Sequence, residues 1–273
     1  MSGQGKVGKA PAVPRPAATA IILRDGPAGL EVFMVVRHHE IDFASGALVF
    51  PGGKVDGQDA DPAWAELAPS VALDADRAFL VAAARETFEE AGLLLARRRG
   101  GSELVDATTA HALVQRYRAP MLAGDATFLD LVRAEDLLLT PDLMVRFAHW
   151  ITPETQPKRF DTHFLLVSAP VAQLGAHDGG ESVEGFWIAP GQALREAEAG
   201  ARTLLFPTHM NLLKLAQHGS VAEAVAAARK ARIVTVTPRV ERTATGRKLH
   251  IPAEAGYGIT EYVPLPPAPA PKA

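Results

Sequence analysis

Phe50-Pro51-Gly52-Gly53-Lys54-Val55-Asp56 and Arg85-Glu86-Thr87-Phe88-Glu89-Glu90-Ala91-Gly92-Leu93 are the two runs of sequence from which the fold can be inferred. The second run lies within Asp74 to Leu95, a segment with no proline, a single glycine near its end, and many alanine, leucine, glutamate and arginine residues. This composition predicts a helix. Three carboxylates then fall at positions i, i+3 and i+4, on one face of that helix: Glu86, Glu89 and Glu90.

A helix face with three crowded carboxylates is suited to binding a metal ion. Like charges at this spacing repel one another by roughly a few tenths of a kcal/mol per pair. A divalent cation reverses that penalty, because hard ions such as Mg²⁺ bind carboxylate oxygens and keep waters and substrate phosphates as further ligands. Arg85 lies four residues before Glu89 and can brace it by an ion pair. A solvated acidic face is the usual meaning of such a run alone, but the upstream Pro-Gly-Gly after an apolar strand favours the metal site.

These residues resemble the box motif of the Nudix hydrolases. That motif reads Gly, five residues, Glu, seven residues, then Arg-Glu-apolar-any-Glu-Glu-any-Gly-apolar. Here Gly53 takes the first position and Asp59 stands where the first Glu belongs. The remaining positions are matched by Arg85, Glu86, Glu89, Glu90, Gly92 and Leu93.

The match departs from the family pattern in three places. Asp59 replaces the first Glu, and Thr87 replaces an apolar residue. Between Asp59 and Arg85 there are 25 residues instead of seven, so 18 are inserted. We expect this insertion to form an excursion outside the metal site that leaves the helix intact, and it leaves the role of Asp59 open. Within it, Trp64 is predicted to be a local packing residue.

The resemblance implies a metal-dependent enzyme that uses Mg²⁺ or Mn²⁺. It assigns metal binding to the backbone carbonyl of Gly53 and to Glu86, Glu89 and Glu90. Water activation in this family comes from a box glutamate or from a carboxylate on a later loop, where Glu181 and Glu184 lie. A solvated loop glutamate is an equal alternative for either of these two. The implied catalytic set is Arg85, Glu86, Glu89, Glu181 and Glu184.

Segments outside the box are similar to those of coenzyme A diphosphatases. These segments include Val36-Arg37, Val49 to Gly53, Lys158 to Thr162, and His177-Asp178-Gly179. The resemblance implies a small-molecule nucleoside diphosphate as substrate, with coenzyme A or acyl-CoA favoured. Because coenzyme A carries an additional 3′-phosphate, charge-assisted contacts to it are expected from a basic group. The candidates are Arg37, Lys158 and Arg159; the triple arginine at 97–99 fits a solvated surface run better.

Two other functions stay open at this point. One is hydrolysis of another nucleoside diphosphate derivative, such as ADP-ribose or NADH, because the box is common to all these enzymes. The other is binding of a nucleotide or metabolite without hydrolysis. The intact carboxylate set disfavours pure binding, which has no evident need for all three acidic groups.

The remaining pattern predicts an α/β fold. Apolar runs predict strands at 17–23, 30–37, 47–50, 143–151, 160–167, 184–188 and 233–240, and helices are predicted at 107–118, 127–134, 190–196, 208–218 and 220–232. A Nudix-like α/β/α sandwich with a mixed sheet fits this order. We expect one Nudix domain at 17–240 with a helical insertion at about 105–136. Residues 1–16 are predicted to be a disordered tail, and 241–273 a C-terminal extension that is Pro/Ala-rich at its end.

Composition excludes several other classes of function. The formal net charge of −3 gives no broad attraction to nucleic acid. The absence of cysteine excludes disulfides and thiolate sites and agrees with a cytoplasmic location. No apolar run reaches the roughly 20 residues of a membrane span, so no membrane partner is expected. Homodimerisation stays open. The histidines at positions 38, 39, 163 and 209 show no metal spacing, and surface or satisfied core positions are expected for them.

Overall fold

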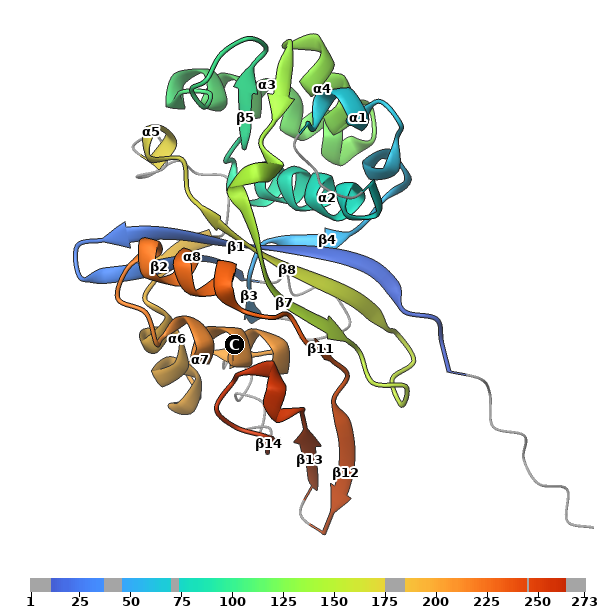
Figure 1. Cartoon of the computed structure of the whole chain (residues 1–273), viewed down its shortest axis with the longest axis vertical. Coiled ribbons are helices and arrows are strands. Elements are labelled where there is room, and N and C mark those ends of the chain that lie inside the picture. The colour runs from blue at the N-terminus through green and yellow to red at the C-terminus, as the bar shows by residue number, and fades with distance from the viewer. Residues whose placement is uncertain (1–10, 37–45, 70–73, 175–184, 245, 264–273) are drawn as a thin grey trace, which may run out of the picture.

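A mixed β-sheet lies between two layers of helices (Figure 1). The computed structural model describes residues 11–36, 46–69, 74–174, 185–244 and 246–263 of the chain. The strands of the sheet are β1 (Arg15–Gly26), β2 (Gly29–Val36), β3 (Ala47–Val49), β4 (Gly52–Lys54), β7 (Met144–Ile151), β8 (Phe160–Ser168), β9 (Gly185–Ile188), β10 (Thr203–Leu204) and β11 (Thr235–Val236).

The pairing of these strands makes the sheet mixed. Their order along the main path is β10-β3-β2-β1-β8-β7-β11, with β4 paired to β1 and β9 paired to β2. Parallel pairs join β1 to β8, β10 to β3 and β11 to β7, and the other pairs in the sheet are antiparallel. Long β1 is central, because its first half pairs with β4 and its second half with β2.

Helices cover both faces of the sheet, which confirms the predicted α/β/α sandwich (Figure 1). One layer consists of α1 (Trp64–Leu67), α2 (Asp74–Ala91), α3 (Ala107–Ala123) and α4 (Phe128–Ala134), with the strand pair β5 (Ala96–Arg98) and β6 (Leu137–Leu139). The opposite layer consists of α6 (Pro190–Glu198), α7 (Phe206–Leu215) and α8 (Val221–Lys230). The short elements are η1 (Gly57–Ala60), η2 (Pro141–Leu143), α5 (Val171–Leu174) and η3 (Ala253–Ala255).

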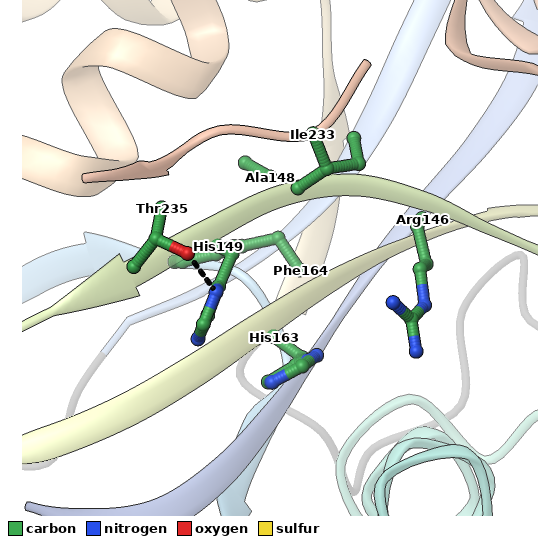
Figure 2. Close-up of a pocket in the computed structure, with 7 residues that line it drawn as sticks. All are labelled: Arg146, Ala148, His149, His163, Phe164, Ile233 and Thr235. Carbon is green, nitrogen blue, oxygen red and sulfur yellow. Dashed lines mark hydrogen bonds between the residues drawn. The ribbon is translucent and has the colours of Figure 1, made fainter. Parts of the chain in front are cut away.

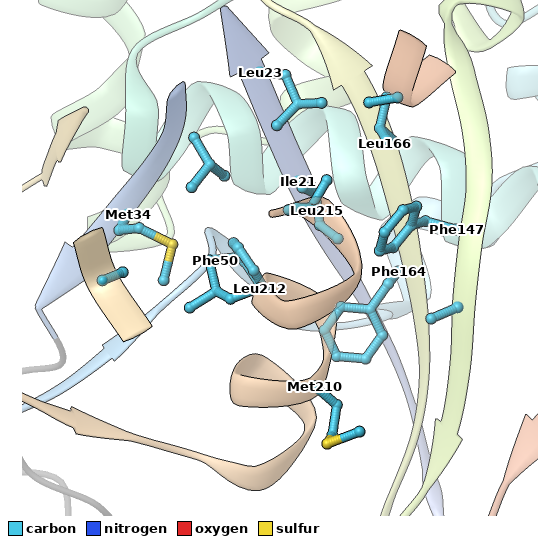
Figure 3. Packing of buried hydrophobic residues seen from close by; sticks show 14 of the residues in the cluster. Ile21, Leu23, Met34, Phe50, Phe147, Phe164, Leu166, Met210, Leu212 and Leu215 are labelled. Carbon is cyan, nitrogen blue, oxygen red and sulfur yellow. The ribbon is translucent and has the colours of Figure 1, made fainter. Parts of the chain in front are cut away.

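The largest hydrophobic cluster fills the space between the sheet and the opposite layer (Figure 3). Ile21 of β1 and Phe164 of β8 meet Leu212 of α7 there, and all three side chains are buried. Burying a side chain of this size contributes about 1.5 to 3 kcal/mol each. This cluster therefore packs one face of the sheet against α6, α7 and α8. The other face of the sheet packs against α2.

Small residues let α2 approach that other face closely. Ala82 and Ala83 of the helix pack against Ala18 of β1 and Leu165 of β8, and all four are almost fully buried. The opposite side of α2 supports a second cluster, in which Phe88 and Trp64 pack around Phe128 of α4. Trp64 is thus a packing residue, as predicted.

The helix at the box ends four residues earlier than predicted. Gly92 follows Ala91 with a φ of 64°, in the left-handed region that glycine adopts at helix ends. The N–H groups of Gly92 and Leu93 donate to the carbonyls of Phe88 and Thr87. Thr87 itself is buried, and its hydroxyl donates to the carbonyl of Ala83 at 2.7 Å. That bond explains how a polar residue is accommodated at an apolar position of the motif.

The C-terminal part adds a separate three-stranded sheet, which the sequence did not predict. Its strands are β12 (Arg239–Thr243), β13 (Gly246–His250) and β14 (Glu261–Tyr262). The predicted strand at 233–240 is divided into β11 and the start of β12, and Pro238 lies at the break, where it has no N–H to donate to a ladder. Among the described residues, no helix has both the length and the apolar character needed to cross a lipid bilayer.

Candidate active site

Arg85 connects the two halves of the box. Its side chain is 4% exposed, and its Nε and Nη2 donate to the two carboxylate oxygens of Asp59, each at 3.0 Å. Its Nη1 donates to Glu86 at 2.8 Å and to Glu89 at 3.2 Å. Nη2 also donates to the carbonyl of Lys54 at 3.0 Å, at the end of the glycine strand β4. A guanidinium has five donors in a fixed plane, so this one side chain can position the loop and the helix together.

Asp59 therefore acts on the site through Arg85. It is 1% exposed, lies in η1 just before the insertion, and binds Arg85 through both oxygens. Oδ2 also accepts from the backbone N–H of Asp56 at 2.8 Å. The 18-residue insertion left its role open in the sequence; in the structure, the residue at the family's first Glu position fixes the arginine.

The two glycines bring the β4 backbone against the carboxylate face of α2. A Cβ atom on Gly53 would lie 2.3 Å from Oε1 of Glu86, closer than any side chain allows. The backbone N–H of Gly52 donates to Oε2 of Glu90 at 3.0 Å. The absence of a side chain at position 53 therefore leaves room for the Glu86 carboxylate where it lies, and the loop in turn binds Glu90.

Burial changes the protonation of these carboxylates. It raises the pKa of Glu86 to about 8; Arg85 opposes the shift, and the charges of Glu90 and Glu89 add to it. Burial also raises the pKa of Glu89, again against the charge of Arg85. Asp59, Glu86 and Glu89 share the one guanidinium of Arg85, so further positive charge is needed to neutralise all three when they are ionised. A divalent cation would supply that charge, so the donor set fits the metal that Nudix hydrolases generally use.

The same carboxylates are not drawn together as ligands. Across the part of the chain that the structure describes, three ligand atoms from different side chains come within 4.8 Å of one another only at His149, Asp161 and His163. Arg85 holds Glu86 and Glu89, while Gly52 holds Glu90. Cation binding by the box would therefore move these side chains closer together.

A basic residue that the sequence did not indicate also reaches the helix end. Arg118 of α3 donates from Nε to the backbone carbonyl of Glu89 at 2.5 Å. Basic side chains often bind the last carbonyls of a helix in this way. Its distance in sequence, 29 residues from Glu89, gave no local signal of this contact.

The other predicted site residues either are not part of this cluster or lie outside the described residues. Arg37, Glu181 and Glu184 lie outside the described residues. Lys158 is exposed. Arg159 is 9% exposed, and it donates to the carbonyls of Thr152 and Ala12 at 2.9 and 2.8 Å.

These contacts hold the N-terminal segment against the β7–β8 hairpin, so most of the Arg159 side chain is already engaged. In the triple arginine, Arg97 pairs with Asp142 and Arg99 with Asp136. Both pairs agree with a surface run.

A scan against family models matches residues 68–214 to the NUDT19 Nudix domain. The chain belongs to the Nudix hydrolase family. The matched segment covers more than half of the sequence and includes the carboxylate face of α2. One of the relatives below is an acyl-coenzyme A diphosphatase that carries the same NUDT19 name as this domain model.

Curated relatives and a solved structure agree with this assignment. The chain is 25% identical to an acyl-coenzyme A diphosphatase NUDT19 of Gallus gallus, over 72% of this chain and 64% of the relative. It is 29% identical to a putative nudix hydrolase 7 of Caenorhabditis elegans, over 68% of this chain and 56% of the relative. The chain thus spans less than two thirds of the length of these relatives.

The crystal structure of a NUDIX hydrolase from Alicyclobacillus acidocaldarius has the same fold. It superposes with a TM-score of 0.61 at 28% identity, over 78% of this chain and 96% of that one.

Proposed function

We propose that this chain hydrolyses the diphosphate of coenzyme A or an acyl-CoA. The products would be 3′,5′-ADP and 4′-phosphopantetheine or its acylated form. The reaction class follows from the family, and the substrate from the acyl-coenzyme A diphosphatase among the relatives. The observation that carries the proposal is the contact between the glycine strand and the helix, where Gly53 leaves room for Glu86 beside Arg85.

In this proposal Glu86, Glu89 and Glu90, with the carbonyl of Gly53, hold Mg²⁺ or Mn²⁺. Such an ion, when bound, neutralises phosphoryl oxygens and lowers the pKa of water. Arg85 keeps the helix face in register with the loop through Lys54 and Asp59. The proton of the attacking water would pass to a carboxylate: Glu86 or Glu89 in the box, or Glu181 or Glu184 on the later loop.

Recognition of the substrate would involve a basic group at the 3′-phosphate of coenzyme A. Arg37 and Lys158 are the preferred candidates for this contact, because Arg159 already donates hydrogen bonds to two backbone carbonyls of the fold. A charge-assisted hydrogen bond contributes about 1.5 to 3 kcal/mol. Removing the 3′-phosphate should therefore lower catalytic efficiency by about tenfold or more. Arg37→Ala should erase most of that difference if Arg37 makes the contact.

The test is product identity under Mg²⁺ or Mn²⁺. Wild-type protein is incubated separately with coenzyme A, dephospho-coenzyme A, ADP-ribose and NADH, and the products are separated chromatographically. We expect 3′,5′-ADP from coenzyme A at the highest efficiency. Preferred release of AMP from ADP-ribose would overturn the coenzyme A assignment, and equal efficiency on coenzyme A and its dephospho form would remove the reason for it.

A further inference from the structure

Two histidines and an aspartate converge on adjacent strands at the other end of the same sheet face. His149 on β7 and His163 on β8 are direct cross-strand partners. Asp161 lies two residues before His163 on β8, so its side chain points to the same face. The two imidazole rings are 4.3 Å apart between centroids, and both extend from the strands toward the same side (Figure 2).

The ligand atoms of these three side chains form a compact group. Nε2 of His149 lies 2.5 Å from Oδ1 of Asp161, and Nε2 of His163 lies 4.0 Å from the same oxygen. Nδ1 of His149 is hydrogen-bonded to Oγ1 of Thr235 at 2.8 Å (Figure 2). That bond fixes the ring and directs Nε2 toward the group, as partners behind metal-binding histidines do.

A contact with α2 holds the ring of His163 in position. Within the described residues, neither ring nitrogen has a hydrogen-bond partner. Phe79 of α2 stacks on the ring with 4.0 Å between centroids and restricts its rotation. The His163 ring is thus held beside the carboxylate of Asp161.

We propose that His149, His163 and Asp161 form a second metal site, for a divalent transition ion of the Zn²⁺ type. Imidazole nitrogen suits zinc, iron, nickel and copper, whereas Mg²⁺ takes oxygen ligands. Three protein ligands leave a fourth tetrahedral position for water or an anionic oxygen. A cavity of about 170 Å³ adjoins the group, with both histidines and Thr235 in its lining (Figure 2). Access for such an ion is therefore open.

This site is separate from the carboxylates of the box. The register places Gly53 opposite Ala18, Ala18 beside His163, and His163 opposite His149. With strands about 4.8 Å apart, the backbones of Gly53 and His163 are about 10 Å apart. Alanines fill the interval, since Ala18 packs against Ala82 and Ala83. Among the described residues, no carboxylate of the box joins this group of ligand atoms within 4.8 Å.

An ion pair engages the arginine beside the site. Arg146 also lines the cavity, but its guanidinium is ion-paired with Asp76 of α2. Asp161 is then the acidic group nearest the two imidazole rings. A simple histidine–aspartate ion pair is the competing explanation, and it requires only His149 and Asp161. The ion pair alone does not explain why His163 lies opposite His149. A variant of His163 therefore distinguishes the two explanations.

The experiment is a calorimetric Zn²⁺ titration in saturating Mg²⁺, which occupies oxygen-ligand sites. Wild-type protein is compared with His163→Ala, Asp161→Asn and the control His111→Ala, which removes an exposed imidazole from α3. We expect one zinc per chain in wild type, with affinity at least about tenfold lower in both site variants. His111→Ala should bind as wild type does. Circular dichroism checks folding, and the isosteric Asp161→Asn carries the test if His163→Ala does not fold.

Two additional samples locate the ion. Thr235→Val keeps the shape of the side chain while removing the hydroxyl behind His149, and should weaken zinc about 10- to 100-fold. Glu90→Gln should leave zinc binding unchanged, because it alters only the box. The absence of a zinc event in wild type, undiminished binding in His163→Ala and Asp161→Asn, or loss of zinc in Glu90→Gln would each overturn the proposal.

Discussion

Gly53, Ala18, His163 and His149 lie side by side across the sheet. The two ends of this row lie next to the same helix, α2, but carry different ligand groups. At one end α2 places Glu86 over Gly53, and at the other it places Phe79 over His163. These helix residues are seven apart, a rise of about 10 Å, which matches two strand spacings. The carboxylate end offers oxygen donors and shares one buried arginine. The histidine end offers nitrogen donors, and the described cation beside it, Arg146, is exposed and paired with Asp76.

Under the two proposals above, one helix lies over two sites with different cation preferences. Hard ions favour carboxylate oxygens, and borderline ions favour imidazole. The alanines between the ends keep them apart without adding a charged group. Perturbing one end should therefore leave the other unchanged, and the following variants test that independence.

Arg85→Ala should have the largest effect. It leaves Asp59 and Glu86 buried without their cation, and breaking a buried pair from one side costs about 3 to 5 kcal/mol. The free energy of unfolding, measured by urea denaturation, should fall by that amount, and turnover should be lost with it. Arg99→Ala is the matched control, since its pair with Asp136 is exposed and should contribute less than about 1 kcal/mol. Equal losses in both variants would contradict the central position of Arg85.

Glu89→Gln and Glu90→Gln should follow. Each removes one charge from the carboxylate face and retains the volume of the side chain. We expect Mg²⁺-dependent hydrolysis of coenzyme A to fall by at least about 100-fold, with the circular dichroism spectrum unchanged. Glu103→Gln, on an exposed residue, should keep wild-type turnover. Wild-type rates in either box variant would show that the active site has been misplaced.

Gly53→Ala should give a smaller loss. The added Cβ would meet Glu86 and force that side chain to move, which should weaken Mg²⁺ by about tenfold, in the range found for disturbed ligand orientation. Gly57→Ala is the control, because a Cβ there meets nothing within 4 Å. Calorimetric titration with Mg²⁺ measures both. An unchanged Mg²⁺ affinity in Gly53→Ala would show that Glu86 does not bind the metal.

The contrast between the ends also explains what the sequence could predict. Glu86, Glu89 and Glu90 lie within one turn or so of a helix, so spacing along the chain was enough to place them together. The strands that carry His149 and His163 were predicted as well. Their register was not, since it depends on the connection between β7 and β8 and on pairing that spacing alone does not determine. His163 was therefore expected at a surface or core position, and the structure groups it with His149 and Asp161.

The same reasoning applies to Asp59 and Arg159. The 18-residue insertion hid the contact between Asp59 and Arg85, which closes over 26 positions of sequence. For Arg159, charge suggested the substrate, whereas burial and two backbone acceptors indicate a contact within the fold. Charge in a sequence does not reveal which donors the fold has already engaged.

The binding of a hard cation by the carboxylates of α2 can be tested by titrating Mn²⁺ and following the decrease of the free-ion paramagnetic resonance signal. Wild type, Glu90→Gln and His163→Ala are compared at equal protein concentration. The carboxylate end should hold Mn²⁺ in wild type and in His163→Ala, and Glu90→Gln should lose most of that binding. Mn²⁺ binding that survives in Glu90→Gln but disappears in His163→Ala would contradict the assignment of the hard cation to the carboxylates of α2.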